Sequence, residues 1–365
     1  MAETPLAERL KRRIALDGPM TVADFMAAAL GDPTHGYYTT RDPLGAAGDF
    51  TTAPEISQMF GELIGLWCAE VWRQMGAPDA VRLVELGPGR GTLMADLLRA
   101  GAMAPGFREA LRVTLVETSP ALRAAQEKTL ADETVPIGWA DGVAAIPEDG
   151  APLLIVANEF FDALPIRQLR RTEAGWREVL VGLDPETDAL AWTLAPGPGP
   201  AAALIPEAAA RAAAPDDVVE IAPVAWGVAG ALARRLAADG GAALIVDYGH
   251  GLSAPGDTLQ AVAAHRYSDV LDRPGEADLT AHVDFEALAR AFSEAGCRAA
   301  PLAAQGDFLR ALGIEMRAAA LARAGDPAAV AAARDRLIGE GAMGSLFKVL
   351  GVAAPQTPPL PGLEG

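Results

Sequence analysis

The stretch Val84-Glu-Leu-Gly-Pro-Gly-Arg-Gly-Thr92 places three glycines within five residues, after a short apolar run and before a helical pattern. Between a strand and a helix, glycines let the backbone pass close under a ligand, and the helix N-terminus offers N–H groups without intrahelical partners. The fingerprint of a nicotinamide dinucleotide site needs a further glycine at position 92, where this chain has threonine. The pattern therefore predicts a small-molecule site and argues against a nicotinamide-dependent dehydrogenase.

Three acidic residues, Glu85, Glu117 and Asp141, lie at or just after the ends of three successive predicted strands. The glycine spacing of Gly87, Gly89 and Gly91, preceded by an acid, resembles motif I of S-adenosylmethionine-dependent methyltransferases. That cofactor carries an amino acid end and no phosphate, so Glu85 suits its amino group. Glu117 is expected to accept the ribose hydroxyls and Asp141 the adenine amino group. The alternative is a tight turn with incidental surface acids, but ligands bind at such strand ends.

Polar residues also follow a wholly apolar run, Leu153 to Ala157. Asn158 and Glu159 should face the same crevice as the glycines, and in methyltransferases this position contacts methyl donor and acceptor. We expect Asn158 to bind the cofactor, and Asn158, Glu159 and Asp162 to form part of the catalytic face. Alternatively, Asn158 caps a helix with Glu159 and Asp162 in its first turn.

Alternation of strand and helix patterns predicts a parallel sheet. With the resemblance to methyltransferases, this sheet implies an α/β fold of the class I methyltransferase type, Rossmann-like and seven-stranded, mostly parallel. We also expect an N-terminal helical arm and inserted helical and antiparallel segments. The predicted organisation is an N-terminal helical arm and lid loop (1–55), a first part of the core (56–165), an inserted β-meander with an Ala/Pro-rich loop (166–222), a second part of the core (223–304), a helical insertion (305–340), a last core strand (341–353) and a disordered tail (354–365).

Charge and residue composition disfavour nucleic-acid-binding, metal-binding and membrane-spanning proteins. The 365 residues carry 48 acidic and 30 basic side chains, a net charge of −18 that disfavours nucleic acid as a partner. The two cysteines lie in apolar surroundings, which favours buried thiols in a reducing compartment. His282 and Asp284 without a third partner are weak evidence for metal, so we expect none. No signal-like or membrane-spanning stretch is evident, and we expect a cytoplasmic location without membrane insertion.

Several motifs together resemble the MidA family, the mitochondrial complex I assembly methyltransferases and their bacterial relatives. The resemblance runs from about residue 17 to 352 and departs at Ala304-Gln305, where Thr-Gln is expected. It implies S-adenosylmethionine as cofactor and, for the mitochondrial members, methylation of a protein arginine on a complex I subunit. The motifs are Glu85 to Thr92, Asn158 to Pro165, Gly48 to Glu62, Asp257-Thr-Leu-Gln260 and Pro274 to Phe285.

An arginine acceptor makes specific demands on the site. A guanidinium stays protonated, with a pKa above about 12, so carboxylates must orient it and take up the released proton. Carboxylates available for this are Glu159, Asp162, Glu55 and Asp49, with Glu55 expected among the catalytic residues. The aromatic residues Tyr37, Tyr38, Phe50 and Phe160 either wall the site or simply pack. The alternative function is an assembly chaperone that binds the cofactor with little or no catalysis.

Overall fold

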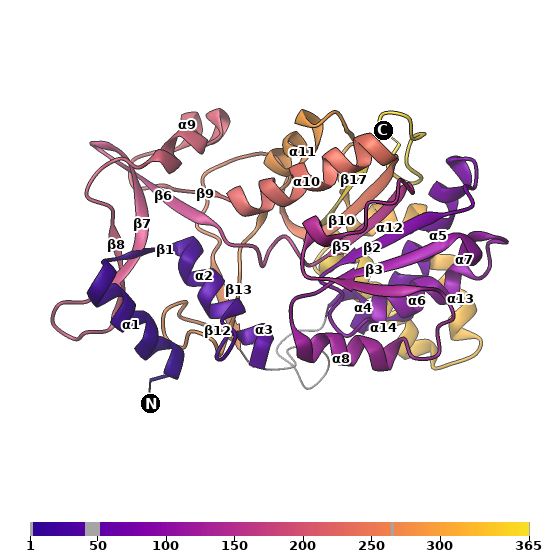
Figure 1. Cartoon of the computed structure of the whole chain (residues 1–365), viewed down its shortest axis with the longest axis horizontal. Coiled ribbons are helices and arrows are strands. Elements are labelled where there is room, and N and C mark those ends of the chain that lie inside the picture. Colours follow the sequence, from indigo (N-terminus) through magenta and orange to yellow (C-terminus); the bar gives the residue numbers. More distant parts are fainter. Residues whose placement is uncertain (1–2, 41–51, 264–265, 365) are drawn as a thin grey trace. The chain divides into compact units, whose positions relative to one another are not determined.

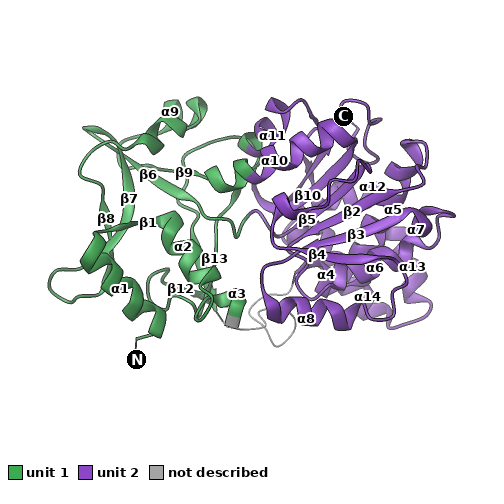
Figure 2. Ribbon diagram, in the orientation of Figure 1, with its two compact units in different colours: residues 1–50, 162–227, 250–287 green, residues 51–161, 228–249, 288–365 purple. Residues whose placement is uncertain are grey.

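The computed structural model describes residues 3–40, 52–263 and 266–364. The expectations for Asp49, for Phe50 and for most of the lid loop therefore lie outside the described residues. The chain folds into two compact units, each built from separated segments (Figure 2). Unit 1 comprises residues 1–50, 162–227 and 250–287, and unit 2 comprises residues 51–161, 228–249 and 288–365.

Unit 2 is built on a mostly parallel sheet, as predicted. Its strands run in the order β15-β17-β10-β5-β2-β3-β4, and β16 also pairs with β17. The five strands from β10 to β4 are parallel, whereas β17 pairs antiparallel with β10. The strands are β2 (Val81–Leu86), β3 (Leu111–Val116), β4 (Ile137–Ala140), β5 (Leu153–Asn158), β10 (Gly241–His250), β15 (Arg298–Ala299), β16 (Ala303–Ala304) and β17 (Phe347–Ala353).

All six residues of β2 and of β5 are buried, which explains why both strands appear in the sequence as nearly continuous apolar runs. Helices follow or precede these strands along the chain (Figure 1). They are α4 (Ala53–Ile56), α5 (Gln58–Gln74), α6 (Thr92–Gly101), α7 (Phe107–Ala110), α8 (Pro120–Thr129), the 3₁₀ turn η1 (Val143–Ala145), α10 (Pro223–Asp239), α11 (Phe285–Glu294), α12 (Gln305–Ala311), α13 (Ile314–Ala322), α14 (Pro327–Ile338) and α15 (Met343–Leu346).

Unit 1 combines the N-terminal helices with antiparallel strands. Two of its sheets run in the orders β1-β7-β6-β9, with β8 beside β7, and β12-β11-β13. Thr21 caps α2 by accepting a hydrogen bond from the Asp24 N–H at 3.0 Å. The elements are α1 (Pro5–Asp17), β1 (Met20–Thr21), α2 (Val22–Gly31), α3 (Tyr37–Thr40), β6 (Arg167–Thr172), β7 (Gly175–Leu183), β8 (Leu190–Leu194), η2 (Pro200–Leu204), α9 (Glu207–Ala212), β9 (Val218–Ile221), β11 (Gln260–Ala263), β12 (Arg266–Ser268), β13 (Asp278–Thr280) and β14 (Val283–Asp284).

The structure differs from the expected organisation in three segments. Residues 250–287, expected in the second part of the core, fall within unit 1. The Ala/Pro-rich segment contains η2 and α9, whose Ala201 and Ala209 pack in an apolar cluster with the meander. The tail is ordered over residues 354–364, because Leu360 and Leu363 are buried and Trp67 donates its indole N–H to the Pro361 carbonyl at 3.1 Å.

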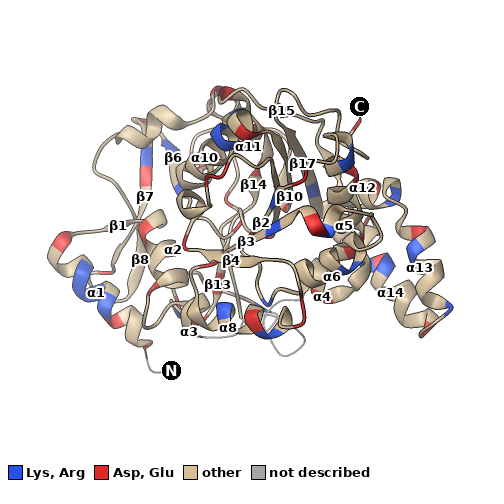
Figure 3. Cartoon of the chain, turned by 45° about the vertical axis from the view of Figure 1, so that its right-hand side comes forward, with Lys and Arg blue, Asp and Glu red and all other residues tan. Residues whose placement is uncertain are grey.

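The basic cluster on α1 is largely neutralised by nearby acids. Arg9 pairs with Asp32 at 2.8 Å, and Lys11 pairs with Glu3 at 2.5 Å. Figure 3 shows the blue band of basic residues on α1 with acidic residues close by. With Arg12, which pairs with Glu8 at 3.6 Å, three of the four basic side chains of α1 have an acidic partner.

Among the described residues, no helix is both long enough and apolar enough to cross a membrane.

Candidate functional site

The glycine turn follows β2 and begins α6. All three glycines have positive φ, +60° at Gly87, +54° at Gly89 and +84° at Gly91, a backbone region that favours glycine. A Cβ atom at Gly87 would lie 3.0 Å from the Phe160 ring. The turn therefore requires glycine at position 87 for its conformation and for its close approach to the segment after β5.

Glu85 lies in β2, immediately before this turn, and only 3% of its surface is exposed. Its Oε2 atom has no hydrogen-bond partner among the described residues. Burial raises the pKa of this carboxyl from 4.5 to about 8. The nearby Cys68 thiol is also buried, and its burial together with the Glu85 charge raises its pKa. The Cys68 thiol is therefore buried, as expected, and Glu85 is a buried acid whose Oε2 has no partner among the described residues.

Glu117 follows β3, and its carboxylate is held by groups close to it in sequence. Its Oε1 accepts the backbone N–H groups of Thr118 at 2.8 Å and Ser119 at 2.7 Å. Its Oε2 accepts from the Gln126 side chain at 3.2 Å. Burial raises the pKa of the carboxyl, and these hydrogen bonds oppose that rise. Glu117 therefore has a defined orientation at the end of β3, next to the glycine turn.

Asp141 follows β4 but is exposed, and its carboxylate pairs with Arg123. Arg123 also donates to the Glu117 carbonyl at 2.9 Å. The structure thus places Asp141 at the expected strand end and links it to the Glu117 backbone. Its proposed contact with adenine stays a prediction.

Asn158 ends β5, and Glu159 starts the segment that follows. Glu159 has φ +52°, unusual for a residue with a side chain, and its N–H donates to the Val246 carbonyl at 2.9 Å. Its Oε1 accepts from the Ala53 N–H and from the Asn158 side-chain amide, both at 3.1 Å. No helix begins between residues 159 and 166, so the alternative of a helix cap at Asn158 is wrong.

Asp247, near the end of β10, holds this segment in place. It is fully buried, and its Oδ2 accepts the N–H groups of Phe160 at 3.2 Å and Phe161 at 3.0 Å. Its Oδ1 accepts the N–H of Tyr248 at 2.9 Å. Asp247 is not among the site residues predicted from the sequence. The signal that could have found it is an acid after five apolar residues of a core strand, the same pattern that identified Glu117 and Asn158.

Glu55 lies in α4 and joins the same region. Its Oε1 accepts the hydroxyl of Thr92, the first residue of α6, at 2.6 Å. Because Glu159 accepts the N–H of Ala53 at the start of α4, this short helix connects the glycine turn with the segment after β5. The structure therefore brings together Glu55, Glu159 and Asn158 as expected.

Asp162 and the two tyrosines belong to unit 1. Asp162 is buried, and its carbonyl accepts the Ala281 N–H at 2.9 Å. The Tyr38 hydroxyl donates to Asp278 at 2.8 Å, and burial with the charges of Asp278 and Asp162 holds the pKa of Tyr38 well above its usual range. Tyr37 is fully buried in an apolar cluster and serves packing. The catalytic role of Asp162 stays a prediction.

Two buried oxygen atoms fit the cofactor that the sequence implies. Glu85 Oε2 and Asn158 Oδ1 have no hydrogen-bond partner among the described residues. They lie on the neighbouring strands β2 and β5, where Leu86 is in register with Ala157. Buried acceptors without donors are costly, and an ammonium group supplies the missing donors. S-adenosylmethionine carries such a group, so Glu85 and Asn158 would hold its amino acid end and Glu117 its ribose.

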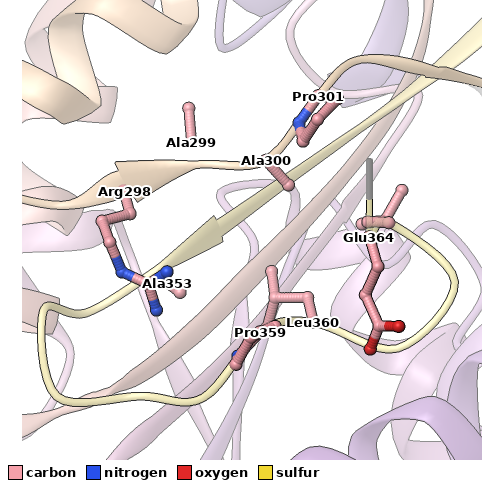
Figure 4. A pocket seen from close by; sticks show the side chains of 9 residues that line it. Arg298, Ala299, Ala300, Pro301, Ala353, Pro359, Leu360 and Glu364 are labelled. Atoms are coloured by element: carbon pink, nitrogen blue, oxygen red, sulfur yellow. The ribbon is translucent and has the colours of Figure 1, made fainter.

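The pocket along β15 and the C-terminal tail is separate from the site at the glycine turn. A pocket of about 560 Å³ is lined by Arg298, Pro301, Leu360 and neighbours along β15 and the tail (Figure 4). Ala353, which lines the pocket, pairs with Ala242 at the amino end of β10. The glycine turn instead follows the carboxyl end of β2. Ligands of such sheets bind at the carboxyl ends of the strands. Within the described residues, no group of three His, Cys, Asp or Glu side chains could hold a metal ion.

The parallel sheet, the glycine turn and the acids at its carboxyl edge define a class I S-adenosylmethionine-dependent methyltransferase. A family model described as S-adenosyl-L-methionine-dependent methyltransferase, Methyltransf_28, matches residues 63–302. The chain belongs to this family, the MidA family expected from the sequence motifs.

Relatives and a solved structure agree with this assignment. The chain is 41% identical over 350 residues to "Protein arginine methyltransferase NDUFAF7, mitochondrial" of Mus musculus, covering 89% of this chain and 78% of the mouse protein. It is 39% identical over 373 residues to the Danio rerio protein of the same name, covering 95% and 86%. A COG1565 superfamily protein from Burkholderia thailandensis, crystallised with S-adenosylhomocysteine, superposes with a TM-score of 0.85 at 29% identity, covering 100% and 96%. The cofactor of this methyltransferase is S-adenosylmethionine.

Proposed function

We propose that this methyltransferase transfers methyl to a protein arginine, on a subunit of respiratory complex I or a related partner. The observation that carries the proposal is the Glu159 carboxylate at the end of β5. It sits on a left-handed turn and is oriented through Oε1 by two donors. The relatives named as protein arginine methyltransferases support the same acceptor class.

The chemistry assigns distinct roles to the residues of this segment. The bound cofactor supplies a methyl group on a sulfonium, and transfer forms a carbon–nitrogen bond as the carbon–sulfur bond breaks, leaving a neutral thioether. The guanidinium nitrogen must lose one proton, and in this proposal the Glu159 carboxylate holds the cation and receives that proton. Asn158 Oδ1, which has no partner among the described residues, can accept an N–H and help orient donor or acceptor. Positioning is therefore the main contribution of the chain.

Glu159→Gln tests this role without disturbing the local structure. A glutamine Oε1 can still accept from Ala53 and Asn158, but the amide neither carries charge nor receives a proton. We expect unchanged affinity for S-adenosylhomocysteine and a loss of turnover of at least about 100-fold, roughly 3 kcal/mol of transition-state stabilisation. Glu159→Asp keeps the charge and should retain part of the activity. Turnover of Glu159→Gln near the wild-type value would contradict the proposal.

The acceptor can be found by labelling all candidate proteins at once. The purified protein is incubated with methyl-labelled cofactor and an extract of cells that lack its gene. Mass spectrometry of respiratory complex I from strains with and without the gene then locates the modification. We expect methylarginine that disappears with the gene and with Glu159→Gln. Binding of cofactor and partner without any labelled product would instead support the alternative, an assembly chaperone.

A further inference from the structure

Gln126 lies in α8, and its polar side chain is fully buried. A buried amide must find hydrogen-bond partners within the protein. The Gln126 side chain makes three hydrogen bonds to three different elements of unit 2. Nε2 donates to the Gly89 carbonyl at 2.7 Å and to Glu117 Oε2 at 3.2 Å. Oε1 accepts the indole N–H of Trp139 at 2.8 Å. One amide thus connects the glycine turn, the acid after β3 and the end of β4.

The bond to Gly89 fixes one peptide plane of the glycine turn. Gly89 has φ +54°, and glycine has access to many backbone conformations, so the turn needs an external constraint. In a trans peptide the carbonyl and the following N–H point in opposite directions. Holding the Gly89 carbonyl toward α8 therefore directs the next backbone N–H away from α8. The backbone of α8 also packs close, because a Cβ at Gly91 would lie 3.5 Å from the Gln126 Cα.

The bond to Glu117 fixes the second oxygen of that carboxylate. Oε1 is already occupied by two backbone N–H groups, whereas Oε2 accepts from the Gln126 amide. A carboxylate oxygen has a second lone pair, so Oε2 keeps the capacity to accept from a ligand hydroxyl. Trp139 in turn determines which end of the amide is the acceptor, so both N–H groups of Gln126 must point to Gly89 and Glu117.

We propose that Gln126 is a positioning residue for S-adenosylmethionine, which sets the glycine turn and the Glu117 carboxylate in a single arrangement before the cofactor binds. Gln126 acts through these groups, because both N–H groups of its amide are engaged and its side chain is fully buried. The role depends on the cofactor class alone and holds whatever the methyl acceptor is.

The test is calorimetric titration of the full-length protein with S-adenosylhomocysteine. Gln126→Met keeps the length of the side chain and removes all three hydrogen bonds. We expect affinity to fall by about 10- to 100-fold, the scale of a lost hydrogen bond to a charged group. Should this variant not fold, Gln126→Asn shortens the amide by one methylene and carries the same expectation. Binding within about threefold of wild type in a folded variant, under 1 kcal/mol, would overturn the proposal.

A matched control separates positioning from general stability. Gln305 is another fully buried glutamine, and its amide donates to the Leu337 carbonyl at 2.8 Å, between α12 and α14. We expect Gln305→Met to lower the melting temperature while leaving affinity for S-adenosylhomocysteine unchanged. An equal loss of affinity in both variants would show that Gln126 contributes only stability.

A double-mutant cycle shows whether Gln126 acts through Glu117. Glu117→Gln and Gln126→Met are titrated separately and together. If the Gln126 amide acts by orienting the Glu117 carboxylate, Gln126→Met should weaken binding much less in the Glu117→Gln background than in the wild-type protein. Full additivity of the two effects would exclude the route through Glu117.

Discussion

The two carboxylates at the carboxyl edge of the sheet, Glu117 after β3 and Glu159 after β5, are positioned in different ways. Glu117 takes its partners from Thr118, Ser119 and Gln126, all within nine residues along the chain. Glu159 depends on Ala53, which is 106 residues away. The Glu117 carboxylate is therefore held by one strand and its following helix, whereas the Glu159 carboxylate also needs a partner from a distant part of the chain.

The backbone shows the same difference. Positive φ angles in the glycine turn fall on glycines, which adopt them without strain. After β5 the positive φ falls on Glu159, where a side chain makes that conformation unfavourable by about 1–2 kcal/mol. Such a conformation persists when the surroundings determine it fully. The N–H bond of Glu159 to Val246 and the bonds of Asp247 to Phe160 and Phe161 provide that constraint.

Gly87 is where the two regions touch, and its substitution should have the largest effect. Gly87→Val introduces a branched side chain at φ +60° and within 3.0 Å of the Phe160 ring. We expect affinity for S-adenosylhomocysteine to fall below detection, since the turn must move and the space beside it is filled. Calorimetric titration measures the affinity, and circular dichroism checks that the fold is retained.

Gly76→Val is the matched control for backbone strain. Gly76 also has positive φ, +90°, but a Cβ there meets no atom within 4 Å. This variant should lose stability yet bind the cofactor product normally. Near-normal binding by Gly87→Val would show that the cofactor does not use the glycine turn.

The pH dependence of stability extends the comparison to Glu85. Its Oε2 has no hydrogen-bond partner among the described residues, whereas both carboxylate oxygens of Glu117 accept hydrogen bonds. The pKa of Glu85 is raised from 4.5 to about 8, so the folded protein keeps a proton that the unfolded chain releases between these values. The free energy of unfolding must then fall as pH rises through this window and level off above about 8. At about 1.4 kcal/mol per pKa unit, the loss from Glu85 amounts to about 5 kcal/mol at most.

Glu85→Gln should remove this part of the pH dependence. Chemical denaturation at about pH 5, 6.5 and 8, spanning the window between the two pKa values, is compared between wild type and variant without cofactor. Other titrating groups are present in both proteins, so they cancel in the difference. We expect the variant to gain stability relative to wild type as pH rises. Parallel stability curves for the two proteins would mean that Glu85 ionises normally in the fold.

Residues that act locally could be predicted from the sequence. The parallel sheet, the glycine turn and Glu117 all follow from runs of neighbouring residues, and the structure places each as expected. Asp247 follows five apolar residues and could have been named as a strand-end acid, but its partners Phe160 and Phe161 are on another element and could not be foreseen. Gln126 could not be assigned, because a lone amide within a helix carries no periodic signal and its partners are on other elements. The place of residues 250–287 in unit 1 could not be foreseen, because they follow a core strand in sequence, while β11, β12 and β13 pair with one another.

Asp247→Asn should have the smallest effect and tests whether the segment after β5 depends on its constraint. The asparagine oxygen can still accept from Phe160 and Phe161, but the amide nitrogen replaces the oxygen that accepts from Tyr248. Loss of charge and of one hydrogen bond should cost roughly 1–2 kcal/mol of stability. If Asp247 orients Glu159, turnover should also fall about tenfold at saturating cofactor, with unchanged affinity for S-adenosylhomocysteine. Turnover is measured on the methylated partner, and denaturation gives the stability. A stability loss without any change in turnover would show that Glu159 holds its position without Asp247, and that the two ends of the site differ less than their contacts indicate.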